Sequence, residues 1–189
     1  MASKQNRLLL SPLILLLTAC VFVRAPTMEE LALLDDPPAE IKHKQNLLAP
    51  LALQWLNETE AALQSKGRSL TEEEATMART VGVRHPGRVR VVILAQFPLP
   101  GDEILRAEAT KYGLGSSAEG GRTMGYVIML KEKYAQQRWI LAHELVHVAQ
   151  QERMGREAFL RRYIAEQELM GYRRAPLELE ANKLALEFM

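Results

Sequence analysis

The chain of 189 residues has one cysteine, few aromatic residues and almost no net charge. A single cysteine excludes intrachain disulfides and the cysteine-rich zinc modules. With 24 basic and 23 acidic residues the formal net charge is +1, so the composition predicts no nucleic-acid partner. The hydrophobic fraction of 48% is ordinary for a globular protein, and the length predicts one domain preceded by a short leader.

The sequence also lacks a long uninterrupted apolar run. Its N-terminal apolar stretch, residues 8–23, contains Pro12 and is shorter than the roughly 20 residues that a membrane-spanning helix needs. Lys4 and Arg7 precede it, and this layout is typical of a secretory signal peptide. An uncleaved membrane anchor stays open as an alternative. A simple cleavage after Ala25 is disfavoured by the proline that follows it.

The end of this stretch, Leu17-Thr18-Ala19-Cys20, resembles the lipobox of bacterial lipoproteins. The resemblance implies a signal peptide over residues 1–19 and a lipid on Cys20 that anchors the protein to a membrane. We therefore expect a protein of the bacterial cell envelope that faces the periplasm or the exterior. Residues 20–39, with consecutive prolines near their end, are expected to link the anchor to a domain of residues 40–189.

Apolar periodicity and turn residues predict the following helices: 40–66, 71–79, 102–112, 139–154, 156–169 and 177–189. Strands are predicted over 88–95 and 123–131. Pro50 is expected to divide the first helix or to begin its second piece. The glycine-rich loop 115–121 is either the rim of an active site or a plain connector. The pattern predicts an α+β fold, mostly helical, with a small mixed sheet beside the helix that begins near residue 139.

That helix contains the pattern His-Glu-x-x-His, from His143 to His147, inside an apolar run without proline or glycine. Side chains four residues apart on a helix point the same way, so the two histidines can bind one metal ion, and zinc favours imidazole ligands. Glu144 would then be placed to take a proton from a water molecule on that ion. A core helix without metal is disfavoured, because buried polar groups need partners. His43 and His85 lie far from the motif and are expected at the surface.

A catalytic zinc needs a third protein ligand. No histidine or cysteine follows the motif, so the candidates are four downstream carboxylates: Glu166, Glu168, Glu178 and Glu180. Ala181 and Ala185 lie on the same helical face as Glu178, and small residues there would let the last helix approach the metal helix closely. Asn182 could support a ligand through a hydrogen bond.

The two segments His143-Glu144-x-x-His147-Val148-x-Gln150 and Glu178-x-x-Ala181-Asn182 resemble the gluzincin zinc metallopeptidases. The resemblance is closest to small bacterial proteins with a minimal zincin-like domain, and it covers residues from about 88 to 189. It implies one zinc ion per chain, held by the two histidines and Glu178, with Glu144 as the general base. Glu180 is the next candidate for the third ligand. The chain departs from the pattern at Asn182, where an aspartate is more usual.

The expected function is hydrolysis of a peptide or protein substrate in the cell envelope. The strand before the metal helix could hold that substrate by strand addition. Four nearby side chains are candidate donors to the oxyanion, and the choice among them stays open: Tyr163, Tyr172, Arg173 and Arg174. The main alternative is a zinc-stabilised lipoprotein that binds a partner without cutting it. A structural anchored helical protein without metal is the weaker alternative.

Overall fold

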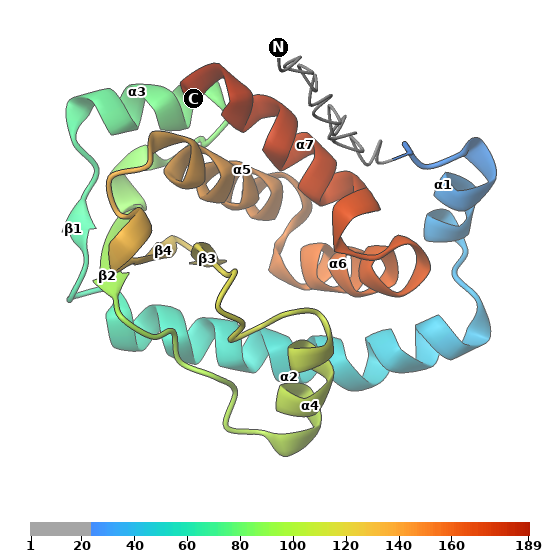
Figure 1. Ribbon diagram of the computed structural model, residues 1–189. Helices are drawn as coiled ribbons and strands as arrows, with labels where there is room; N and C mark the ends of the chain where they lie inside the picture. Colours follow the sequence, from blue (N-terminus) through green and yellow to red (C-terminus); the bar gives the residue numbers. More distant parts are fainter. Residues whose placement is uncertain (1–23) are drawn as a thin grey trace, which may run out of the picture.

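The computed structural model describes residues 24–189. The predicted signal peptide and Cys20 lie outside the described residues. The predicted α+β class is confirmed, because about 63% of the described residues are helical and they contain one small mixed sheet of four strands (Figure 1). None of the helices within residues 24–189 combines the length and the apolarity that a membrane crossing requires.

The described residues form seven α-helices and four strands. The helices are α1 (Met28–Asp35), α2 (Ala39–Leu63), α3 (Glu72–Thr80), α4 (Glu103–Lys111), α5 (Arg138–Met154), α6 (Arg156–Met170) and α7 (Pro176–Ala185). The strands are β1 (Arg68–Ser69), β2 (Arg90–Leu94), β3 (Gly121–Met124) and β4 (Val127–Lys131). Short 3-10 turns include η3 (Tyr172–Arg174) and η4 (Leu186–Phe188). The last helix is therefore shorter than predicted, since α7 ends at Ala185 and continues only as η4.

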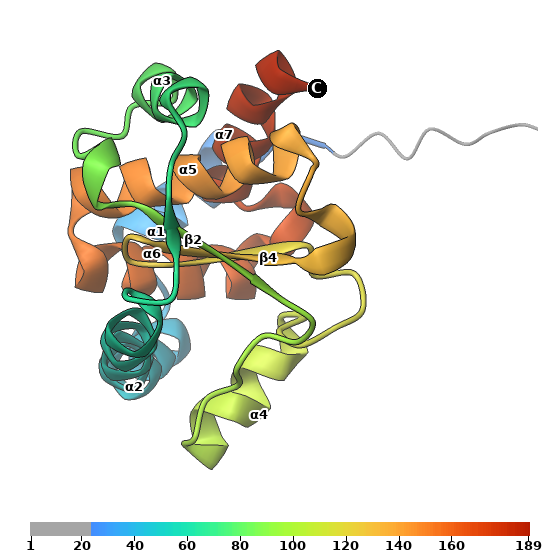
Figure 2. The ribbon, with the colours of Figure 1, turned by 90° about the vertical axis from the view of Figure 1, so that its left-hand side faces the viewer.

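The sheet has the strand order β1-β2-β4-β3, with β2 parallel to β4 and the other pairs antiparallel. Its side chains alternate between two cores. Val91 and Ile128 pack with α5 on one face, and Val92 and Met129 pack with α2 on the other. Figure 2 shows the sheet between these two helices. Strand β3 forms the edge of the sheet, next to α5.

The prediction of one strand over residues 123–131 is wrong. The segment is a hairpin, in which β3 and β4 are joined by Gly125 and Tyr126. Gly125 has φ +65°, which a two-residue hairpin turn requires and which glycine adopts without strain. The N–H of Tyr126 donates to Oε1 of Glu60 at 2.7 Å, which fastens the turn to α2. The apolar residues on both sides of the turn conceal it in the sequence.

The prediction that Pro50 interrupts the first helix is also wrong, because α2 runs unbroken through it. Proline removes the hydrogen bond to the carbonyl of Asn46, four residues earlier. Both residues are exposed, so water can satisfy that carbonyl. The substitution of one hydrogen bond by water is a small cost for a helix of 25 residues.

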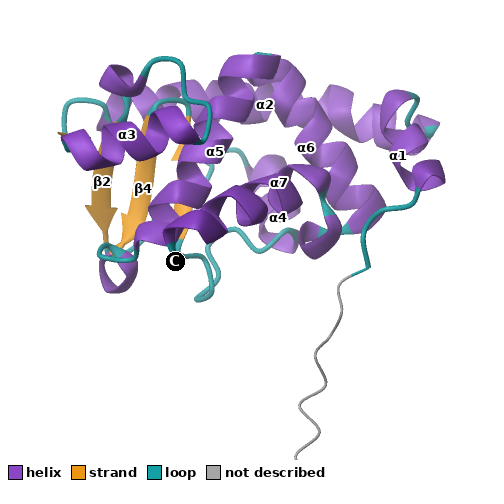
Figure 3. Ribbon diagram, turned by 90° about the horizontal axis from the view of Figure 1, so that it is seen from above, coloured by secondary structure: helices purple, strands orange, loops and turns teal. Residues whose placement is uncertain are grey.

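Part of the segment predicted as a linker is folded. Residues 28–35 form α1, which begins with a capping box between Thr27 and Glu30. Leu34 is buried against α6. Figure 3 shows α1 beside α6, at the end of the molecule opposite the sheet. Consecutive prolines separate α1 from α2, so they mark a turn between two packed helices rather than a free linker.

Candidate metal centre

Helix α5 carries the His-Glu-x-x-His pattern through the core, and every residue from Ile140 to Gln151 is buried. Helix α7 packs against it through Ala181 and Ala185, which belong to the same apolar core as Leu145 and Val148. Two small side chains at this contact allow the helices to approach closely, as the sequence predicts. Figure 1 shows α7 beside α5. Their contact brings Glu178 of α7 to the two histidines of α5.

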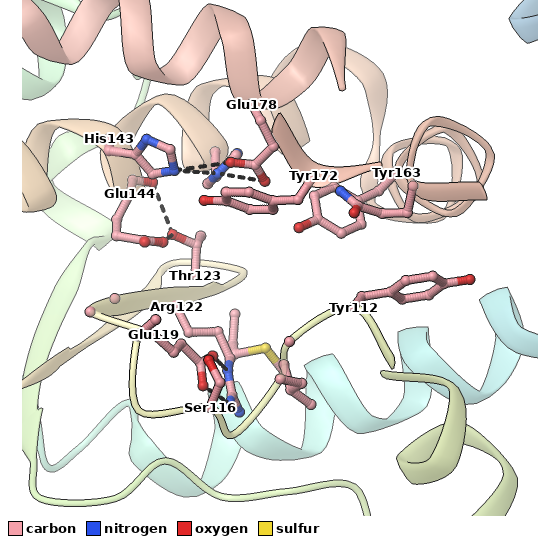
Figure 4. A pocket seen from close by; sticks show the side chains of 18 of the residues that line it. Tyr112, Ser116, Glu119, Arg122, Thr123, His143, Glu144, Tyr163, Tyr172 and Glu178 are labelled. Carbon is pink, nitrogen blue, oxygen red and sulfur yellow. Dashed lines mark hydrogen bonds and ion pairs between the residues drawn. The ribbon is translucent and has the colours of Figure 1, made fainter. Parts of the chain in front are cut away.

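Three side chains converge where the two helices meet. Nε2 of His143 lies 3.1 Å from Nε2 of His147 and 3.3 Å from Oε2 of Glu178. Oε1 of Glu178 lies 3.6 Å from Nε2 of His147. All three residues are buried. Figure 4 shows the imidazole of His143 directed at the carboxylate of Glu178.

The donor set and its unmet hydrogen-bonding needs fit a metal ion. Ligands about 2.1 Å from a tetrahedral ion lie roughly 3.4 Å from one another, close to the observed spacing. Within residues 24–189, Oε2 of Glu178 is buried without a hydrogen-bond partner, which is costly for a carboxylate unless a cation compensates it. The group of His143, His147 and Glu178 can therefore bind a metal ion. Two imidazoles and one carboxylate suit several divalent transition metals.

Charge within the cluster supports the same conclusion. Burial alone would lower the pKa of His147, but the carboxylates of Glu178 and Glu144 outweigh it and raise this pKa to about 9. Burial likewise opposes the charged form of Glu178, yet His147 and His143 hold its pKa well below the usual range. Glu178 thus stays ionised at neutral pH. In the metal-free protein a proton on His147 compensates it, and a metal ion must displace that proton.

The side chain of Gln150 orients His147. Its Nε2 donates to the carbonyl of Leu177 and to Oε2 of Glu180, each at 2.9 Å, so its Oε1 faces Nδ1 of His147 at 2.8 Å. Because an amide oxygen only accepts, neutral His147 carries its proton on Nδ1 and turns the lone pair of Nε2 toward the cluster. Gln150 belongs to the motif, but no role was predicted for it. The signal that the sequence offered for this role was the position of Gln150, three residues after His147.

The other candidate carboxylates have different partners. Glu180 binds Arg153 at 2.8 Å, Glu166 binds Arg162 at 2.7 Å, and Glu168 binds Lys44 at 2.8 Å. Each of these acids is therefore compensated by a base away from the histidines. Of the four candidates, only Glu178 joins them.

Asn182 does not have the predicted supporting contact. It is exposed, and within residues 24–189 no hydrogen bond joins it to His143, His147 or Glu178. Gln150, on α5 itself, provides the support that was expected from Asn182 on α7.

Strand β3 holds Glu144 beside the cluster. Oγ1 of Thr123 lies 2.7 Å from Oε2 of Glu144 and 2.9 Å from its main-chain oxygen. A Cβ atom at residue 121 would lie 2.6 Å from Oε1 of Glu144, so only glycine leaves room for this carboxylate. Neither Thr123 nor Gly121 was predicted to act at the site, because their contact with Glu144 depends on the hairpin.

The cluster opens into a cavity of about 1030 Å³. Residues of the loop 115–121 border this cavity, so the loop lies where the rim of a site would lie. Tyr163 and Tyr172 also line it, and Figure 4 shows both rings beside Glu178. Burial and the negative charge of Glu178 raise the pKa of each tyrosine, so both hydroxyls stay protonated and can donate.

The two arginines proposed as donors do not line the cavity. Arg174 binds Glu30 at 2.5 Å and so fastens η3 to α1, and Arg173 is exposed. His43 and His85 are exposed as predicted, and His85 lies 3.1 Å from the carboxylate of Glu152.

Residues 116–155 are similar to a protein family described as the eCIS core domain. The matched stretch is less than a quarter of the chain. It contains the loop, the hairpin and α5, hence His143, Glu144 and His147, but not Glu178. No curated protein and no solved structure matches the chain.

Proposed function

We propose that the protein is a zinc-dependent metallopeptidase in which His143, His147 and Glu178 hold one zinc ion. The observation that carries the proposal is the convergence of three buried ligand atoms beside Glu144, at the wall of an open cavity. Two histidines and one glutamate are a ligand set of catalytic zinc, and the spacing of the motif is that of metalloproteases. The order of these residues in the chain supports the resemblance to gluzincins.

A bound zinc ion would polarise a peptide carbonyl and lower the pKa of a water molecule to about 7. Glu144 would take the proton of that water while its oxygen forms a bond to the carbonyl carbon. It would then deliver the proton to the amide nitrogen as the carbon–nitrogen bond breaks. The hydroxyl of Thr123 keeps the carboxylate of Glu144 in place for both transfers.

Tyr172 is our candidate for the donor to the oxyanion. Its ring lies next to Glu178, and its hydroxyl is directed to the side of the cluster where Glu144 lies (Figure 4). A protonated hydroxyl in this position can donate a hydrogen bond to charge that develops on the carbonyl oxygen. Tyr163 lies farther from Glu144 in the same view and is the second candidate.

The edge of β3 offers main-chain groups to a substrate. The carbonyl of Gly120 accepts from the N–H of Lys131 at 2.9 Å. Inward and outward groups alternate along an antiparallel strand, so the main-chain groups of Gly121 and Thr123 point away from β4. An extended peptide could pair with them and place one of its carbonyls beside Glu144.

The location of the protein is part of the same proposal. The lipobox at residues 17–20 supports a lipid anchor on Cys20, which would hold the enzyme at a membrane of the bacterial cell envelope, facing the periplasm or the exterior. Its substrates would then be peptides or proteins of that compartment.

The substitution Glu144→Gln tests the proposal. We expect zinc to stay at about one ion per chain while peptide hydrolysis falls by roughly 10²- to 10⁴-fold, since the general base is lost. Hydrolysis at the wild-type rate would refute the assignment of Glu144. Stoichiometric zinc without hydrolysis of any peptide by the wild-type protein would instead support a zinc-stabilised lipoprotein that binds a partner.

A further inference from the structure

The cavity extends past the metal cluster into a space between α2 and α6, which we call the chamber. Six of its lining residues define it: Ala52, Trp55, Leu56, Leu160, Tyr163 and Gln167. On each helix these positions lie about one turn apart, so a single face of α2 and a single face of α6 form the two walls. The chamber is continuous with the space in front of Glu144.

The walls of the chamber are largely apolar. Trp55 and Leu160 are only partly buried, although they contact the core between α2 and the sheet. Apolar surface in a concave space is covered favourably by an apolar group of a ligand. The guanidinium of Arg122 lies over the indole of Trp55 at 5.5 Å from the ring centroid, and the rest of the indole surface in the chamber can contact an aromatic ring.

One polar atom in the chamber is free to meet a ligand. Gln167 is 6% exposed, and its Nε2 is buried too deeply for a ligand atom to reach. Its Oε1 keeps some exposure where the residue lines the cavity, and within residues 24–189 it accepts no hydrogen bond. A ligand that brings a hydroxyl or N–H donor to this oxygen therefore gains a hydrogen bond.

The charges at this end of the cavity are paired. Glu168 accepts from Lys44 at 2.8 Å and from the hydroxyl of Tyr112. Lys111 binds Glu108. A charged substrate side chain would therefore find no free counterion among these groups and would lose its hydration.

We propose that the chamber is the subsite for a substrate side chain with a large ring and a neutral polar tip, of which tyrosine is the natural example. The ring would lie against Trp55 and Leu160, and the phenol hydroxyl would donate to Oε1 of Gln167. A phenylalanine side chain would fit without the hydrogen bond, and an acidic or basic side chain would be rejected. This inference rests on the proposed function, because the ligand is a substrate only if the protein is a peptidase. Binding of the side chain in the chamber does not itself require hydrolysis.

Binding is tested on the full-length protein with Trp139→Phe, which leaves Trp55 as the single tryptophan. The probes are N-acetyltyrosinamide and N-acetylphenylalaninamide, and the readout is the fluorescence of Trp55. We expect the tyrosine probe to bind about 2- to 10-fold more tightly, the usual effect of one neutral hydrogen bond. Adding Gln167→Met, which keeps the length of the side chain, should make the two affinities equal. Gln54→Met on the exposed face of α2 is the matched control and should preserve the preference.

Hydrolysis is tested with a mixture of peptides of all compositions and the wild-type protein. We expect tyrosine and phenylalanine to dominate at one position next to the cleaved bond. Ala52→Phe, which fills the chamber, should move that preference to small side chains, provided that its melting temperature shows a folded protein. If it does not fold, Gln167→Met still decides the matter through the ratio of tyrosine to phenylalanine.

The outcomes separate the two proposals. Equal affinities for the two probes in the wild-type background, or a tyrosine preference that survives Gln167→Met, would overturn the chamber as described. Peptide hydrolysis without an aromatic preference would overturn the chamber and keep the peptidase. Preferential binding of the tyrosine probe without hydrolysis of any peptide would support the chamber and overturn the proposed function.

Discussion

The two ends of the cavity are built in different ways. At the metal end, side chains from α5, α7 and β3 hold one another through hydrogen bonds, and the unmet needs are those of the cluster itself. At the chamber end, α2 and α6 present apolar side chains and one amide oxygen that accepts no hydrogen bond within residues 24–189. Under the two proposals, the first arrangement would fix a few atoms for chemistry, whereas the second would select by size and by a single hydrogen bond. Substitutions should therefore have larger effects at the metal end.

The largest effect is expected from the ligands. His143→Ala or Glu178→Ala should abolish stoichiometric metal binding, because each removes one of three ligands and leaves the remaining charges buried without compensation. Metal content and melting temperature, with and without added zinc, measure this. Lys183→Ala, at an exposed position of the same helix, is the control and should retain the metal. A Glu178→Ala protein that kept one ion per chain would remove Glu178 from the site.

Gly121→Ala should come next. Its Cβ would lie 2.6 Å from Oε1 of Glu144, so the carboxylate must move while the cluster is untouched. We expect the turnover of peptides to fall by about 10²-fold with metal content unchanged, as small displacements of a catalytic group have such effects. Gly87→Ala is the matched control, because nothing lies within 4 Å of its Cβ. Equal turnover in the two variants would show that β3 does not position Glu144.

A smaller effect is expected from the residue that orients His147. Gln150→Leu removes the acceptor for Nδ1 while it keeps similar bulk, and we expect metal affinity to fall by about 10- to 100-fold. Competition with a chelator of known affinity measures the change. Gln54→Leu, at an exposed position of α2, should leave the affinity unaltered. An unaltered affinity in Gln150→Leu would mean that His147 is held by packing alone.

The smallest of these effects is the pH dependence of stability and of metal binding. The folded-state pKa of His147 is raised from 6.5 to about 9, so in the metal-free protein its contribution to the free energy of unfolding is complete below pH 6.5 and is lost as the pH rises through about 9. Between these values metal binding must release this proton, and the apparent affinity should rise with pH. Calorimetric titrations in buffers of different ionisation enthalpy should give about one proton released per metal ion near pH 7.5. A value near zero there would show that His147 is already neutral.

Local signals account for what the sequence predicts correctly. Thr71 and Asp102 begin α3 and α4 through their own side chains, and Gly155 and Gly171 separate the helices near the end of the chain. The face shared by His143 and His147 follows from the helical period alone. The hairpin turn at Gly125 was missed because apolar residues flank it closely on both sides.

The contacts that complete the site are not local. Thr123 and Glu144 are 21 residues apart, and Gln150 and Glu180 are 30 apart. The walls of the chamber come from helices roughly a hundred residues apart in the sequence. No pattern in either segment reveals such a pairing, since it depends on how the sheet and α5 pack. Glu178 was preferred among four acids through the small residues on its helical face and the resemblance to gluzincins. The structure adds a physical difference, since the other three acids have basic partners away from the histidines.

The metal content of the full-length protein, purified without added metal and without a histidine tag, tests the central claim most directly. The account predicts about one zinc ion per chain in the wild-type protein and its loss in His143→Ala. Absence of bound zinc even after zinc is supplied to the folded protein would contradict the account, because the proton on His147 would then be the cation that compensates Glu178.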